Sequence, residues 1–196
     1  MEMLALATPL SVIAKHRDNL TQLTALLLGQ AGLLSTEDER YEEYAFLRTK
    51  FDLTPLSPSL WKQGRIRPQA RPSVRIEQLA QLLYRSEFLL SQCMEMTNVD
   101  ELRMFFAPTG MGKSSVDSLL INVVTPFLYA RNRQQQALDL LHNLPAEDNR
   151  IIRQWQTLGQ SVIDAADTQA LIHLYQTCCE QGRCMQCSVW SEITYH

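Results

Sequence analysis

The residues with the most distinctive chemistry are cysteines that crowd the C-terminal end of the chain. Of five cysteines, four are Cys178, Cys179, Cys184 and Cys187. The spacing Cys-x4-Cys-x2-Cys supplies soft thiolate donors, and Cys178, His173 or His196 can add a fourth ligand. Zinc prefers four such ligands at tetrahedral corners, and iron–sulfur clusters use four thiolates. These thiols therefore form a candidate metal site, with zinc as the candidate ion.

Other interpretations of the cysteines stay open. Cys178 and Cys179 are neighbours on an expected helix and point about 100° apart, so we expect only one of them to ligate a metal. Free cysteine also behaves as a small hydrophobic residue, and the thiols can simply pack. Thiol–disulfide catalysis is less favoured, because the Cys-x-x-Cys pair follows a helix instead of opening one after a strand.

A second group of residues is basic. Between residues 62 and 75 there are five basic side chains and no acidic one, and prolines hold the segment extended. The basic residues are Lys62, Arg65, Arg67, Arg71 and Arg75, and Trp61 directly precedes them. Arginine matches phosphate geometry and tryptophan can stack on a base, which predicts contact with nucleic acid or phosphate. The structural alternative is that these arginines pair with the acidic residues between Glu37 and Glu43.

A third pattern resembles a phosphate-binding loop. The stretch Ala107-Pro-Thr-Gly-Met-Gly-Lys-Ser114 has the glycines, the lysine and the hydroxyl that such a loop uses to hold phosphates and Mg²⁺. That loop requires a buried strand before it and a parallel sheet around it. Residues 100–106 are typical of a helix instead, so we expect 107–114 to join two helices, with an ATP-binding enzyme as a minor alternative.

The composition limits the classes of function. The chain has 196 residues, a net charge of -3 and 20% charged residues, which argues against a general coat for nucleic acid or a membrane-surface protein. No run reaches the roughly 18 apolar residues of a membrane-spanning helix, and Glu2 stands where a signal peptide carries positive charge. We therefore expect a cytoplasmic protein. No serine–histidine–acid or paired-carboxylate arrangement suggests catalysis.

The elements that position these residues are helical by their apolar periodicity. We expect helices over residues 9–28, about 36–51, 73–93, 98–106, 119–129, 133–143, 147–159 and 166–181. Ser73 and Asn98 are the expected N-caps of two of them. Residues 119–129 are strongly apolar and contain Pro126, which favours a kinked buried helix with a buried strand as the competitor. Residues 52–72 form the longest irregular stretch.

These elements predict an all-α fold. We expect an irregular multi-helix bundle or array with a long proline- and arginine-rich loop and a cysteine-rich C-terminal segment. At this length the chain fits one helical domain over residues 1–196, with 178–196 as an appendage.

Several short motifs, taken in order, resemble a known family. They are Gly29-Gln-Ala-Gly-Leu33, Trp61-Lys-Gln-Gly-Arg-Ile-Arg-Pro68, Ser73-Val-Arg-Ile-Glu-Gln-Leu-Ala80, Ile121-Asn-Val-Val-Thr-Pro126, Leu144-Pro-Ala-Glu-Asp-Asn149 and Cys179…Cys184-Met-Gln-Cys187. From about residue 3 to residue 190, the chain is similar to the C-terminal half of an uncharacterised bacterial family, domain of unknown function 2851 (DUF2851). It looks shortened near residues 106–112.

The resemblance implies that an N-terminal half, with an acidic and histidine-rich motif suggestive of nuclease-like chemistry, belongs to the longer family members. We therefore expect this chain to be a non-catalytic accessory or scaffold domain that packs on a partner protein or on such a missing half. The alternative is a nucleic-acid-binding helical module that uses residues 62–75.

Overall fold

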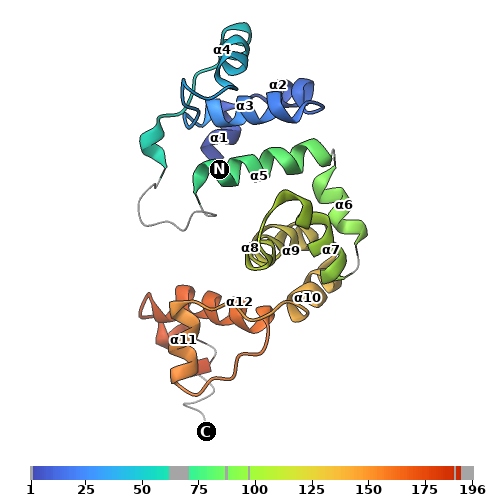
Figure 1. The fold of residues 1–196 in the computed structure, drawn as a ribbon. Coiled ribbons are helices and arrows are strands. Elements are labelled where there is room, and N and C mark those ends of the chain that lie inside the picture. Colours follow the sequence, from blue (N-terminus) through green and yellow to red (C-terminus); the bar gives the residue numbers. More distant parts are fainter. Residues whose placement is uncertain (1, 62–70, 87, 97, 188, 191–196) are drawn as a thin grey trace. The chain divides into compact units, whose positions relative to one another are not determined.

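The structure is a computed structural model that describes residues 2–61, 71–86, 88–96, 98–187 and 189–190 (Figure 1). These residues form α-helices joined by short 3₁₀ and π-helical turns. Over the same ranges there is no β-strand, and an isolated bridge joins Pro145 to Asp164. The all-α prediction is confirmed.

The chain divides into two compact units. The first unit contains Met1–Ser91 and Phe106–Met111, and the second contains Gln92–Phe105 and Gly112–His196. The prediction of a single domain over residues 1–196, with 178–196 as an appendage, stays a prediction.

The first unit is built around one buried helix. Its helices are α1 (Glu2–Ala7), α2 (Leu10–His16), α3 (Leu20–Gln30), α4 (Tyr41–Lys50) and α5 (Pro72–Arg85), with a 3₁₀ turn at Pro58–Leu60. In α3 every residue from Leu23 to Gln30 is buried, and α3 contacts both α4 and α5 (Figure 1). A helix buried on all sides must be apolar all round, which explains why α3 carries five leucines.

Several helices of this unit are shorter than the apolar periodicity predicts. The expected helix over 9–28 is two helices, because the Asn19 side chain accepts a hydrogen bond from the Gln22 backbone N–H at 3.1 Å and starts α3 anew. The helix expected from residue 36 begins at Tyr41, since Asp38 bonds the Arg40 backbone in a turn. The expected cap Ser73 lies inside α5, which begins with Pro72 in the first turn.

The helix expected over residues 73–93 is also divided. It ends at Arg85, and α6 (Leu89–Glu95) follows. Cys93 on α6 is completely buried, and this burial raises the pKa of its thiol to about 11. Cys93 is therefore a core residue, separate from the C-terminal cysteines.

The second unit consists of shorter helices. They are α7 (Val99–Phe106), α8 (Lys113–Leu119), α9 (Thr125–Ala130), α10 (Gln134–His142), α11 (Arg150–Thr157) and α12 (Ala165–Leu174). The Asn98 side chain accepts a hydrogen bond from the Glu101 N–H at 2.8 Å, which confirms the predicted cap of α7. The cysteine-rich segment begins in a π-helical turn, Tyr175–Cys179, and continues to a 3₁₀ turn, Cys184–Gln186.

The apolar segment 119–129 is helical, so the strand alternative is wrong. Helices α8 and α9 are joined by a π-helical turn, Leu120–Val124, without leaving helical backbone. Pro126 directly follows the π-helical turn within this continuous helical backbone, where it cannot donate a backbone hydrogen bond. Val116, Leu120, Val124 and Leu128 are all buried along this segment. None of the described helices combines the length and the apolar character that crossing a membrane demands.

Candidate functional site

A buried polar network fixes helix α1 to the core of the first unit. The Gln30 side chain, which is fully buried, donates from Nε2 to the Ala7 carbonyl at 2.7 Å. The Tyr44 hydroxyl donates to Gln30 Oε1 at 3.0 Å, and burial raises the pKa of Tyr44. Because a buried amide without partners is costly, this network favours one position of α1 on α3.

Gly29 makes room for this network. A Cβ atom at position 29 would overlap the Tyr44 ring, so only glycine allows α4 to approach α3 this closely. Gly32 instead has a left-handed backbone with φ of 68°, as expected just after a helix. Gly29 therefore serves close packing of α4 on α3.

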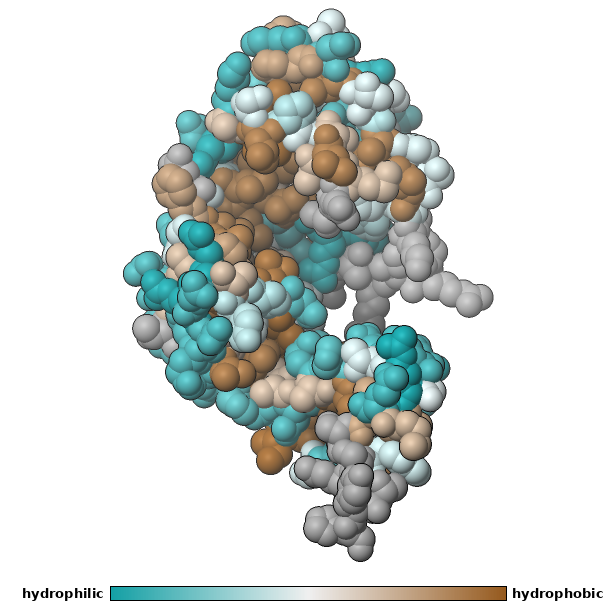
Figure 2. Space-filling view, turned by 180° about the vertical axis from the view of Figure 1, so that it is seen from behind, coloured by the Kyte–Doolittle hydropathy of each residue, from teal (hydrophilic) through white to brown (hydrophobic). Residues whose placement is uncertain are grey.

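The opposite side of α1 is apolar and exposed. Leu4 is buried against α3, whereas Met3, Leu6 and Leu10 are 51%, 81% and 78% exposed. Met3 and Leu6 lie three residues apart on α1, and Leu10 begins α2, so the three exposed side chains come from two consecutive short helices. We call Met3, Leu6 and Leu10 the N-terminal apolar face. Figure 2 shows apolar residues that reach the surface of the first unit, in the upper part of the view.

Part of the basic segment can be placed. Lys62, Arg65 and Arg67 lie outside the described residues. The Trp61 indole N–H donates to the Ala31 carbonyl at 2.7 Å, and the ring packs against the leucine core of the unit. Trp61 thus has a role within the fold, and base stacking by this residue stays a prediction.

The two described arginines of the segment have different surroundings. Arg71 is exposed, directly before α5. Arg75 Nη1 donates to Gln78 Oε1 at 2.9 Å, and Gln78 Nε2 in turn donates to the Gly110 carbonyl at 3.2 Å. Contact with nucleic acid or phosphate stays a prediction for the six residues as a set.

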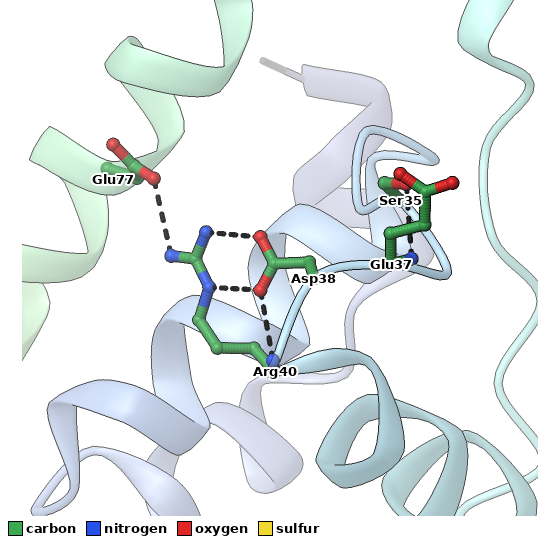
Figure 3. Close-up of polar contacts among 5 residues, drawn as sticks. All are labelled: Ser35, Glu37, Asp38, Arg40 and Glu77. Atoms are coloured by element: carbon green, nitrogen blue, oxygen red, sulfur yellow. Dashed lines mark hydrogen bonds and ion pairs between the residues drawn. The ribbon is translucent and has the colours of Figure 1, made fainter.

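Asp38, one of the acidic residues expected to pair with the basic segment, is paired with Arg40 instead. Arg40 binds Asp38 through two hydrogen bonds, Nε to Oδ1 at 2.8 Å and Nη2 to Oδ2 at 2.7 Å (Figure 3). Its Nη1 also lies 3.3 Å from Glu77 Oε1, so Arg40 links the turn before α4 to α5. Hydrogen bonds from Arg40 lower the pKa of Asp38 to about 2.

Residues 107–114 do not form a phosphate loop of the strand–loop–helix type. Helix α7 precedes the stretch where a strand is required, and Ala107–Thr109 is a 3₁₀ turn. The Met111 N–H donates to the Thr109 hydroxyl at 3.3 Å, so this backbone donor has an internal partner. The expectation that this stretch joins two helices is confirmed. The ATP-binding alternative therefore lacks the scaffold it needs.

The C-terminal cysteines line a single cavity in the second unit. The cavity measures about 200 Å³, and its wall contains Cys178, Cys179, Cys184 and Cys187 together with Trp155, Leu174, Val189 and Trp190. All four are free thiols. Both Cys178 and Cys179 line the cavity from the π-helical turn, and the expectation that only one of them ligates a metal stays a prediction.

The sulfur of Cys187 accepts several hydrogen bonds. Backbone N–H groups of Trp190 and Val189, and the thiol of Cys178, lower the pKa of Cys187. Burial raises the pKa of Cys179, to which the neighbouring thiols also contribute. Within the described residues, no three His, Cys, Asp or Glu side chains are arranged to hold a metal ion. The thiols therefore share one cavity without forming a closed coordination shell.

Comparison with known proteins identifies the family. Residues 1–110 match the family described as "Protein of unknown function (DUF2851)". The chain belongs to the DUF2851 family. Searches of the curated proteins and of the solved structures give no match. The predicted resemblance is thus confirmed over residues 1–110, which include α1, α2, Trp61 and the Gln30 network of this DUF2851 chain.

Two polar features of this DUF2851 chain have no signal in the sequence. Gln30 lies within a leucine-rich helix, and its hydrogen-bond partners, Ala7 and Tyr44, are 23 and 14 residues away in the sequence, so no local spacing predicts them. Arg103 on α7 binds Asp117 on α8 through Nε and Nη2 at 2.8 and 3.0 Å, and Asp117 is buried. Helical periodicity places apolar faces but does not say which polar residues meet across helices.

Proposed function

We propose that this DUF2851 chain is a helical accessory domain, without catalysis of its own, that packs on a partner protein through the N-terminal apolar face. The observation that carries the proposal is the exposure of Met3, Leu6 and Leu10 on helices whose other side is fixed to the core. Burying a leucine side chain contributes roughly 1.5–3 kcal/mol, so leaving two of them in water is a cost that a partner would remove.

The way α1 is held supports a docking role. Gln30 binds the last residue of α1, and the Thr8 hydroxyl donates to the Leu4 carbonyl at 2.8 Å directly after it. Because this end of the helix is already ordered, little conformational entropy is lost when a partner binds. A preorganised apolar face is a common feature of protein interaction surfaces.

The chemistry of the face indicates the kind of partner. No charged residue occurs between Met3 and Ala14. Helices that bind lipid surfaces normally carry lysine or arginine along their polar side, which this stretch lacks. Met3 and Leu6, three residues apart on α1, have the spacing that fits a groove of another helix. The partner we propose is therefore a protein that presents an apolar helix.

The test is photo-crosslinking in the source cell. A photoreactive residue at position 6 should give one crosslinked protein, and mass spectrometry should place the crosslink on an apolar helix face of that protein. The double variant Leu6→Glu/Leu10→Glu should lose the complex, since it buries two charges in the interface. Its far-UV circular dichroism should be unchanged, because both side chains are exposed.

The matched control is Thr21→Glu/Thr54→Glu, which adds the same charge at two other exposed positions of the first unit. This control should keep the complex. The proposal is wrong if Leu6→Glu/Leu10→Glu keeps it too, or if the control loses it equally. A crosslink to a second copy of this chain, with a dimer seen by sedimentation, would also replace the proposed partner.

A further inference from the structure

The backbone around the C-terminal cysteines forms a turn that reverses the chain between Cys179 and Cys184. After the π-helical turn, the Arg183 N–H donates to the Cys178 carbonyl at 2.8 Å and the Gly182 N–H to the Cys179 carbonyl at 3.2 Å. Gly182 has φ of 65°. These two bonds with a left-handed glycine define a Schellman motif, which ends the helix and reverses the chain. The reversal carries Cys184 back toward Cys178 and Cys179.

Cys187, the second cysteine of the Cys-x-x-Cys pair, has backbone N–H groups near its sulfur. The Cys187 sulfur accepts backbone hydrogen bonds from Val189 and Trp190. Such N–H groups stabilise a thiolate that binds a metal, because they neutralise part of its charge and orient its lone pairs. Cys187 is also the buried member of the 184–187 pair.

The segment that carries the thiols has little else to hold it. From Glu180 to Gln186 every residue is exposed, and its regular structure is one three-residue 3₁₀ turn. Met185 is 87% exposed. Such a segment buries too little apolar surface to be fixed by packing, and small structures of this kind are commonly held by a metal or by disulfides. Here the thiols are free.

We propose that Cys178, Cys179, Cys184 and Cys187 bind one Zn²⁺ ion, which closes the C-terminal segment onto the end of α12. Four thiolates match the tetrahedral preference of zinc, and the apolar wall of Trp155, Leu174 and Val189 offers no competing oxygen ligand. Since no three ligands are yet in coordination geometry in the described residues, the ion must draw the thiols inward.

The first experiment measures metal content. The full chain is purified under reducing conditions without chelator, incubated with excess Zn²⁺ and gel-filtered, and zinc is measured by mass spectrometry. We expect about one zinc per chain. Replacement by Co²⁺ should give the intense sulfur-to-cobalt charge-transfer absorption and the d–d bands of a tetrahedral thiolate site. Chain without bound zinc, or chain that instead holds iron and sulfide, overturns the proposal.

The variants assign the ligands. Cys184→Ser/Cys187→Ser should reduce bound zinc at least tenfold, and so should Cys178→Ser/Cys179→Ser. Cys93→Ala is the matched control, because Cys93 is a buried thiol outside the cavity, and it should retain zinc like the original chain. Circular dichroism shows whether each variant folds. Equal zinc in the original chain and either serine pair would contradict the four-thiol site.

Stability provides a second readout. The chain with zinc should melt at a higher temperature than the chain treated with chelator, because a ligand that binds only the folded form stabilises it. The serine pairs should show no such difference. The Leu6→Glu/Leu10→Glu variant should bind zinc normally, so failure of the metal site and failure of the proposed partner face are separate results.

Discussion

The interior of the first unit and the cysteine segment of the second are ordered by different physics. In α3 every residue from Leu23 to Gln30 is buried, and α4 and α5 pack on it. From Glu180 to Gln186 every residue is exposed, and the backbone turns on a few hydrogen bonds. Burial fixes the first region through many weak contacts. The second can be fixed only by a few strong ones, which is the role that the proposed metal would have.

We therefore expect mutations in the two regions to change the stability of the protein for different reasons. Side-chain volume should decide stability around α3, whereas ligand chemistry should decide it around the cysteines.

The largest expected effect is the removal of a core side chain. Leu27→Ala should lower the free energy of unfolding by about 3 kcal/mol, because it leaves a cavity among buried leucines. Met185→Ala, on the exposed cysteine segment, should change it by less than about 0.5 kcal/mol. Urea denaturation of both variants measures the difference. Equal effects would remove the contrast between the two regions.

The next effect comes from adding one carbon. Gly29→Ala should cost about 2 kcal/mol, since the new methyl group meets the Tyr44 ring and pushes α4 from α3. Gly112→Ala is the control, because no atom lies within 4 Å of its added Cβ and its φ is -67°. The control should cost at most about 1 kcal/mol, as alanine is a poorer N-cap than glycine. A neutral Gly29→Ala would show that α4 is not held where the structure places it.

A smaller effect concerns the stability of the Asp38–Arg40 pair at low pH. The folded pKa of Asp38, about 2, is below its ordinary value of 3.8, so the Arg40 pair stabilises the first unit above pH 4. That stabilisation is lost as the pH falls from about 4 to about 2. Asp38→Asn should reduce stability at pH 7 by at most about 1 kcal/mol, given the partial exposure of the pair. The gap between variant and original chain should close near pH 2, as urea titrations at several pH values would reveal.

The smallest effect lies in the second unit and depends on the protonation of a histidine. His142 Nδ1 is 2.9 Å from Asp164 Oδ2, and this hydrogen bond raises the pKa of His142 above 6.5. The contribution is complete below the unfolded pKa and is lost as the pH rises through the folded pKa. Asp164→Asn keeps an N-cap for α12 but should lower the His142 pKa in an NMR titration. An unchanged pKa would mean that the pair does not form in solution.

Apolar periodicity predicted the class of the fold and most helix positions, but it did not predict where helices break. Leu10 to Leu28 have one continuous helical pattern, yet Asn19 caps a new helix, because a local side-chain bond outweighs the continuity of the pattern. Asp38 delays the start of α4 for the same reason. Such local bonds are visible in the sequence as residue types, but their geometry is not.

The candidate sites were predictable to different degrees. The cysteines show themselves by spacing, and the structure adds that both members of the adjacent pair reach the cavity. The N-terminal apolar face was not predictable, since the sequence does not say which side of α1 meets α3. Trp61 suggested a base platform, but its indole N–H binds Ala31 across 30 residues of chain, a contact that no local pattern encodes.

The π-helical turn at Leu120–Val124 explains the spacing of the buried apolar residues in this segment. Val116, Leu120, Val124 and Leu128 recur at strict steps of four and are all buried. In a regular α-helix each such step rotates the side chain by about 40° past its predecessor, so the last would face well away from the first. The extra residue in the π-helical turn offsets this rotation. Apolar residues at every fourth position of a long stretch can thus predict a π-helical turn from the sequence alone.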